Sequence, residues 1–166
     1  MSQRAKNGEI GEYIVKTRLE RLGWQVINSN DEKKNHPNFD LIATKEDHLV
    51  RIQVKAKGHR TKASLAGSWS PGKPTFNKSE NFETADFLVM VRFTPSDPDD
   101  NECFVFTMDE ANQEVDWFAQ QLIDRGKSTK HIYPYVSLRP RRSREYPFNT
   151  GEHWQPYLER WEALRT

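Results

Sequence analysis

The sequence has 166 residues, 35% of them hydrophobic, and a formal net charge of +1 at pH 7. This length suits one domain with a hydrophobic core, so we expect a single domain over residues 1–166. The longest apolar run, residues 87–91, is far shorter than the roughly 20 residues that span a bilayer, and the polar start is no secretory signal. We therefore expect a cytoplasmic protein without a membrane segment.

The first predicted element is an amphipathic helix that contains Glu12 and ends near Gly23. Glycine suits the left-handed conformation that often ends a helix. On a helical wheel Glu12 lies about 20° from Leu19, at the edge of the apolar stripe. We predict that Glu12 faces the sheet; the alternative is a solvated charge that pairs with Lys16. The stripe consists of Ile10, Ile14, Val15, Leu19 and Leu22.

The next predicted element is a β-hairpin whose strands cover residues 38–43 and 51–56, with a polar turn at residues 45–48. Side chains alternate along a strand, so Val50, Ile52 and Val54 share one face, and Arg51, Gln53 and Lys55 share the other. Asp40 opens the partner strand beside Gln53 and Lys55. A carboxylate, an amide carbonyl and an ammonium group can therefore converge, which suits a hard divalent cation beside a phosphate.

Two short motifs in this hairpin resemble those of the PD-(D/E)xK nuclease superfamily, and more narrowly its Holliday-junction-resolvase-like and Mrr-like branches. Pro37-Asn38-Phe39-Asp40 resembles the acidic motif, and Gln53-Val54-Lys55 resembles the second motif, with Gln53 where most members have Glu. The similarity covers roughly residues 8–57. It implies an α/β fold of the restriction-endonuclease type, with a mixed β-sheet flanked by α-helices. No obvious helix follows the second motif.

The resemblance and the hairpin together predict a magnesium site, at which Mn²⁺ is a substitute. Glu12 and Asp40 would supply carboxylate oxygens, Gln53 its amide oxygen, and Val54 its backbone carbonyl. Lys55 would orient the attacking water and stabilise developing charge. The predicted catalytic residues are therefore Glu12, Asp40, Gln53 and Lys55. Because glutamine carries no charge, we expect weak metal binding in the absence of nucleic acid.

Charge is strongly segregated along the chain. Residues 51–78 contain seven Lys or Arg and no Asp or Glu, whereas residues 79–124 contain twelve acidic residues and one arginine. A second basic block covers residues 125–148. Basic residues that continue directly from the second motif are well placed to hold a phosphate backbone, although such blocks can also be solvated loops. The predicted nucleic-acid contacts are Lys57, Arg60, Lys62, Lys73, Arg141 and Arg142.

The remaining elements predict packing rather than chemistry. Strands over residues 87–93 and 103–108 should pair across a turn at residues 94–101. Thr107 and Glu110 form a capping box before a helix that runs to Gly126. A last helix over residues 154–164 should pack its aromatic face on the core, and Cys103 reads as a core thiol that excludes an intramolecular disulfide.

Two function classes are consistent with these patterns. The first is a metal-dependent DNA endonuclease in repair, recombination or restriction of foreign DNA. The second is a catalytically inactive, nuclease-derived nucleic-acid-binding module. Phosphate-loop, dinucleotide-turn and hydrolase-elbow motifs are missing from the sequence. DNA is the expected partner in both classes, and a homodimer is left open.

Overall fold

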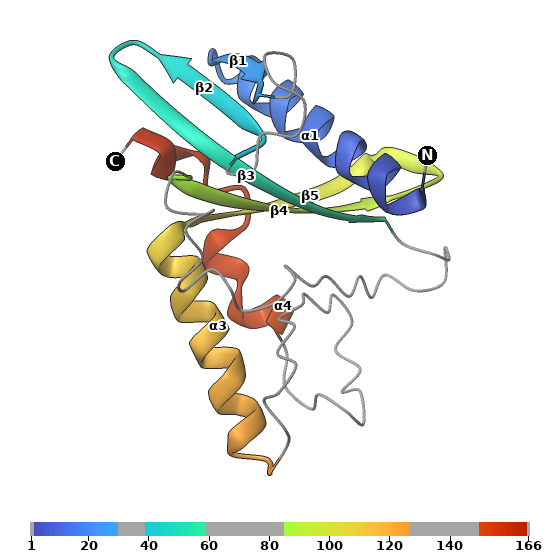
Figure 1. The fold of residues 1–166 in the computed structure, drawn as a ribbon, viewed down its shortest axis with the longest axis vertical. Coiled ribbons are helices and arrows are strands. Elements are labelled where there is room, and N and C mark those ends of the chain that lie inside the picture. The colour runs from blue at the N-terminus through green and yellow to red at the C-terminus, as the bar shows by residue number, and fades with distance from the viewer. Residues whose placement is uncertain (1, 30–38, 59–84, 127–149, 166) are drawn as a thin grey trace.

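The fold was analysed in a computed structural model that describes residues 2–29, 39–58, 85–126 and 150–165. Five strands form one sheet, with helix α1 and the C-terminal residues 161–165 on one face and helix α3 with residues 150–157 on the other (Figure 1). The elements in chain order are α1 (Gln3–Arg21), β1 (Gln25–Asn28), β2 (Leu41–Lys45), β3 (His48–Gly58), β4 (Phe87–Thr94), β5 (Asp97–Thr107), α3 (Met108–Ile123), α4 (Thr150–His153) and two 3₁₀ helices, η2 (Gln155–Tyr157) and η3 (Trp161–Arg165).

Helix α1 ends next to Gly23, as predicted, and its start, which was not predicted, is capped by Ser2. The Ser2 hydroxyl caps the first turn by accepting a hydrogen bond from the Ala5 N–H at 3.3 Å. Gly23 follows the helix with a φ of +84°, a conformation that glycine adopts without strain. Ile14, Val15 and Leu19 are buried against the sheet and Ile10 is partly buried, which confirms the predicted apolar stripe at these residues. The prediction is wrong for Leu22, which lies beyond the last helical residue and is exposed.

The strand order is β1-β2-β3-β4-β5, and only the β3–β4 pair is parallel. The predicted hairpin is present as β2 and β3. Its turn is shorter than predicted, because the turn consists of Glu46 and Asp47 while His48 already belongs to β3. Strand β1 was not predicted; it lies at the sheet edge and pairs antiparallel with β2 over four residue pairs, from Gln25 with Thr44 to Asn28 with Leu41.

The two faces of β3 are separated as the alternating pattern predicts. Val50, Ile52 and Val54 belong to the core beneath α1. Gln53 lies beside Leu88 of β4, whose side chain belongs to the core on the α3 side. Gln53 and Lys55 therefore face away from α1. The core on the α3 side consists of Leu88, Met90, Phe104, Phe106, Ala111 and Trp154.

Strands β4 and β5 pair as antiparallel neighbours, as predicted, but their connection is shorter than predicted. Strand β5 begins at Asp97, so that the turn consists of Pro95 and Ser96. The capping box is present: the Glu110 N–H donates to the Thr107 hydroxyl, and the Thr107 N–H donates to the Glu110 carboxylate. None of the helices in the described ranges has the length and apolar composition that crossing a membrane requires.

The prediction of one helix over residues 154–164 is wrong. The segment consists instead of two 3₁₀ helices, η2 and η3, with a bridge between Leu158 and Phe104 of β5 before η3 begins. Glu159 has a φ of +52°, and its N–H donates to the Cys103 carbonyl at 2.8 Å, so pairing with β5 interrupts a continuous helix here. The predicted packing role of Trp154 and Trp161 is confirmed, since both side chains are buried.

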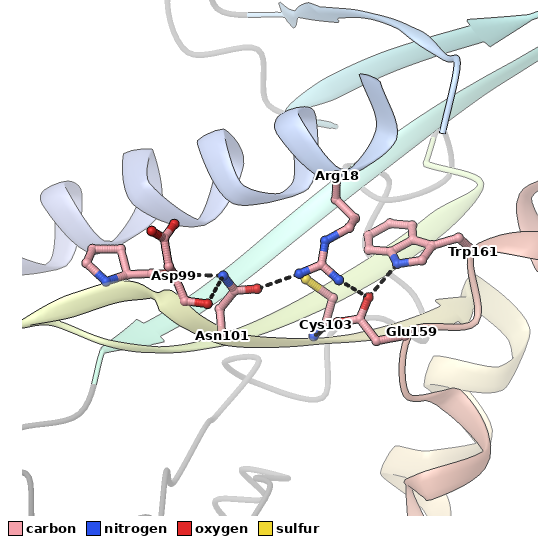
Figure 2. A network of polar contacts seen from close by, with 7 residues as sticks. Arg18, Asp99, Asn101, Cys103, Glu159 and Trp161 are labelled. Carbon is pink, nitrogen blue, oxygen red and sulfur yellow. Dashed lines mark hydrogen bonds and ion pairs between the residues drawn. The ribbon is translucent and has the colours of Figure 1, made fainter. Parts of the chain in front are cut away.

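The Glu159 carboxylate fastens this segment to the body of the protein (Figure 2). It forms an ion pair with Arg18 of α1 and accepts hydrogen bonds from the Trp161 indole N–H at 2.7 Å and the Cys103 backbone N–H at 3.1 Å. Arg18 also donates to Asn101 of β5 at 2.9 Å. This cluster, the Glu159 clasp, joins α1, β5 and the C-terminal segment. Burial raises the pKa of the Cys103 thiol, and this confirms that it is a core thiol.

Two carboxylates of α3 fasten the same segment on the other face. Glu110 forms an ion pair with Arg160. Glu114 is buried and accepts hydrogen bonds from the Trp154 indole N–H at 2.6 Å and the Tyr157 hydroxyl at 2.9 Å. Burial and the neighbouring Glu114 carboxylate raise the pKa of Tyr157 to about 12, so its hydroxyl stays a neutral donor.

Candidate active site

The Asp40 carboxylate lies at the edge of β3, immediately before β2 begins. Its Oδ2 atom accepts two hydrogen bonds, from the Gln53 side-chain amide at 2.6 Å and from the Val54 backbone N–H at 2.7 Å. The backbone N–H of Asp40 in turn donates to the Ile52 carbonyl at 2.9 Å. The structure therefore brings the acidic motif and the second motif into direct contact, although twelve residues separate them in the sequence.

The charge of Asp40 is only partly compensated by these neighbours. Burial raises the pKa of this carboxyl group, against the Val54 N–H and the positive charge of Lys55, which both lower it. A raised pKa means that the folded protein disfavours the bare carboxylate. Such a group gains from a cation beside it, and this is a common property of functional sites.

The backbone of Val54 adds a second kind of oxygen to this edge. The N–H and C=O groups of one residue in an extended strand leave the strand on the same side. Because the Val54 N–H donates to Asp40, the Val54 carbonyl is directed to the same edge of β3. Gln53 is 6% exposed and has its amide group at this edge through Asp40.

Glu12 comes to the sheet from α1. Its side chain is half-buried, and its Oε2 atom accepts a hydrogen bond from the Asn28 side-chain amide at 2.7 Å. Asn28 ends β1 and lies opposite Leu41, the residue that follows Asp40. The alternative of a solvated Glu12 is wrong, because this side chain is half-buried and bonded to Asn28; Lys16 forms an ion pair with Glu20 at 3.9 Å.

Glycine at position 11 allows α1 to approach β3 this closely. A Cβ atom at Gly11 would overlap the Cβ atom of Ala56 and lie 3.5 Å from Val54 Cγ1. The helix backbone therefore rests directly on the strand that carries the second motif. This contact fixes the height of Glu12 above the sheet, since Glu12 is the next residue.

Replacing Gly11 by alanine should lower the melting temperature and displace Glu12. An added methyl group in a packed contact typically costs about 1–3 kcal/mol, which is roughly 2–12 °C for a protein of this size. Gly8→Ala is the matched control, because nothing lies within 4 Å of a Cβ atom there. Alanine favours the helix over glycine, so the control should melt at the same temperature or higher. Equal melting temperatures for both variants would contradict the close contact.

The oxygen atoms at this edge fit a hard divalent cation. They come from the Asp40 carboxylate, the Gln53 amide and the Val54 backbone carbonyl, and Mg²⁺ prefers oxygen ligands of this kind. No three His, Cys, Asp or Glu side chains within the described ranges gather as a metal cluster.

The predicted nucleic-acid contacts fall outside what the structure describes. This holds for the side chain of Lys57 and for Arg60, Lys62, Lys73, Arg141 and Arg142. These residues remain predictions. Strand β3 ends at Gly58, so the first basic block continues directly from the strand that carries Gln53 and Lys55.

The sequence interpretation did not include Asn28 and Ser29, the two residues at the end of β1. Ser29 is buried; its hydroxyl donates to the carbonyls of Phe39 at 2.7 Å and Asp40 at 3.0 Å. Its backbone N–H also donates to the Asp40 carbonyl, at 2.9 Å. A short strand after Gly23 is indicated by Val26 and Ile27, but no local pattern pairs that strand with the acidic motif.

The amino-acid sequence matches no known protein-family model and no curated protein. Among solved structures, the fold is similar to that of a bacterial homing endonuclease, I-Ssp6803I, with a TM-score of 0.55 and 19% sequence identity. The similarity covers 99% of this chain and 92% of that one. At this identity the likeness concerns the fold, and it confirms the predicted α/β class with a mixed sheet flanked by helices.

Proposed function

We propose that this protein is a metal-dependent DNA endonuclease of the PD-(D/E)xK type, acting in repair, recombination or restriction of foreign DNA. The observation that carries the proposal is the contact of Asp40 with Gln53 and Val54 at one edge of β3. The shared fold with a bacterial homing endonuclease supports it.

Four residues would hold the metal: Glu12 and Asp40 through carboxylate oxygens, Gln53 through its amide oxygen, and Val54 through its carbonyl. The Gln53 amide can serve both partners, because its nitrogen donates to Asp40 while its oxygen remains a separate atom. Bound Mg²⁺ would supply Lewis-acid polarisation of the phosphodiester and an acidified water. With Gln53 neutral, substrate phosphate would complete the ligand set.

Lys55 would act on the water and on the developing charge. It shares the face of Gln53 on β3 and lies close enough to Asp40 for its charge to lower the pKa of that carboxyl. An ammonium group at this position can hold an attacking water by hydrogen bonding and can stabilise the extra negative charge on the phosphate oxygens.

A nuclease-derived binding module is the second candidate, and the neutral Gln53 favours it, since a site with one carboxylate fewer attracts metal less strongly. Glu12 weighs against it because this side chain is directed to the sheet rather than to solvent. Incubation of plasmid and branched DNA with Mg²⁺ or Mn²⁺, beside the Asp40→Ala protein, decides between them. Cleavage by wild type alone supports the endonuclease, and metal-independent binding without cleavage supports the module.

Replacing Gln53 by glutamate should tighten Mg²⁺ binding in the absence of DNA while lowering the melting temperature of the metal-free protein. The new carboxylate adds an anionic ligand of nearly the same length. It also removes the amide donor 2.6 Å from Asp40 and sets two negative charges together. Calorimetric titration of Mg²⁺, with melting curves in EDTA and in Mg²⁺, measures both effects. Unchanged metal affinity with a lower melting temperature in both media would remove Gln53 from the metal site.

Replacing Lys57, Arg60 and Lys62 together by alanine should weaken DNA binding and flatten its salt dependence. Each lost phosphate contact lowers the slope of log K against log salt by about 0.9. Alanine at Arg21 and Arg165 is the control, because both side chains are exposed and lie outside the two basic blocks. The slope is measured by fluorescence anisotropy over a salt series. If the triple variant kept the wild-type slope, these three residues would not contact the DNA phosphate backbone.

A further inference from the structure

Two successive residues, Asn28 at the end of β1 and Ser29 after it, contact both acidic residues of the proposed metal site. The Asn28 side chain donates to the Glu12 carboxylate, and Ser29 donates to the backbone carbonyl of Asp40 through its N–H and its hydroxyl. Glu12 belongs to α1, whereas Asp40 comes immediately before β2. The dipeptide Asn28-Ser29 therefore links these two parts of the fold.

The direction of the Asn28 side chain follows from the sheet. Val26 is buried beneath α1, and side chains two residues apart on a strand share a face. Asn28 therefore points to the α1 side, where Glu12 is. The hydrogen bond of 2.7 Å fixes the rotation of the Glu12 carboxylate, whose flexible side chain would otherwise sample several rotamers.

Ser29, which follows Asn28, holds the end of β1 close to the backbone of Asp40. The Ser29 side chain is 3% exposed and bonds two successive carbonyls, those of Phe39 and Asp40. These bonds continue the β1–β2 pairing by one residue beyond its last ladder partners, Asn28 and Leu41. The backbone from which the Asp40 carboxylate extends is thereby tied to β1.

We infer that Asn28 is a positioning residue of the metal site, which sets the Glu12 carboxylate against Asp40 without itself contacting the metal. This inference rests on the proposed function. Removal of a residue that hydrogen-bonds a metal ligand typically lowers metal affinity or activity by about 10- to 100-fold. Asn28 has the chemistry of such a partner, because its amide donates to a carboxylate.

The test is a titration of Mn²⁺ alone, with free ion followed by electron paramagnetic resonance. Asn28→Leu keeps the shape of the side chain and removes its donor, so Mn²⁺ affinity should fall by about 10-fold or more. Gln25→Leu is the matched control, an exposed amide on the same strand, and should bind Mn²⁺ as wild type does. Melting temperature and DNA affinity in EDTA should be unchanged in Asn28→Leu relative to that control.

A double-mutant cycle with Glu12→Ala distinguishes positioning from a general effect on the strand. If Asn28 acts through Glu12, Asn28→Leu should cause no further loss of Mn²⁺ affinity when Glu12 is alanine. An equal loss in both backgrounds, or no loss in either, would overturn the inference.

The Asp40→Asn protein separates failure of the inference from failure of the proposed function. If Asp40→Asn loses Mn²⁺ binding and Asn28→Leu does not, the metal site stands and the role of Asn28 falls. If Asp40→Asn binds Mn²⁺ as wild type does, or wild type binds none, the proposed site itself is wrong and the inference falls with it.

Discussion

Replacing Asp40 by asparagine should reduce DNA cleavage by at least about 10³-fold, the upper range for removal of one preorganised catalytic group. Asparagine keeps an oxygen that can accept the Val54 N–H and removes the charge that the proposed cation needs. Lys55→Ala should cause a loss of about 10²–10³-fold for the same reason. Both rates are measured on plasmid DNA under single-turnover conditions.

The fold should survive these changes, because Asp40 and Lys55 lie at the polar edge of the sheet rather than in either core. Melting temperatures and circular dichroism check this. Asp47→Asn is the matched control, since it makes the same chemical change at an exposed position in the β2–β3 turn. Cleavage by Asp40→Asn or Lys55→Ala at the rate of Asp47→Asn would refute the assignment of these residues.

Replacing Glu114 by alanine should have the largest effect on stability, a loss of about 3–5 kcal/mol. The buried carboxylate accepts from Trp154 and Tyr157 and lies 2.7 Å from the His153 ring nitrogen. Its removal leaves buried donors unpaired, and each such group costs about 1–3 kcal/mol. For a protein of this size the melting temperature should fall by roughly 6–20 °C.

Asp116→Ala is the control for this prediction, because Asp116 is an exposed acid of the same helix. Exposed substitutions of this kind usually change stability by less than about 0.5 kcal/mol. Urea unfolding of both variants compares the free energies directly. A Glu114→Ala protein as stable as Asp116→Ala would show that the C-terminal segment is held by its aromatic packing alone.

Local patterns in the sequence predicted the elements that carry the second motif. The alternation along residues 50–55 correctly places the side chains of Val54 and Gln53 on opposite faces of the sheet, because side chains along a strand have a period of two. The helix that carries Glu12 was predicted with its end at Gly23, since helical spacing and a terminating glycine are both local signals. The sequence predicted that Asp40 and Gln53 lie close together, but it did not predict the hydrogen bonds that the Asp40 carboxylate accepts from Gln53 and Val54.

The interactions that escaped prediction join residues far apart in the sequence. Asn28 and Glu12 are 16 residues apart, and Glu114 and Trp154 are 40 apart. A helical wheel places Glu12 at the edge of an apolar stripe, but it does not predict which residue Glu12 contacts. The last segment was predicted as a helix from its aromatic spacing, whereas hydrogen bonds to β5 override that preference at Glu159.

The Glu159 clasp also joins two parts of the chain that lie far apart in the sequence. Arg18 and Glu159 are separated by 141 positions, so their contact closes a loop that contains most of the chain. Contacts of such long range slow folding, because loop entropy is lost before the contact is gained. The contacts that place Glu12 are much shorter in range, since Gly11 packs on Ala56 and Glu12 accepts from Asn28. The proposed active site can therefore take shape within residues 3–58 before the clasp closes.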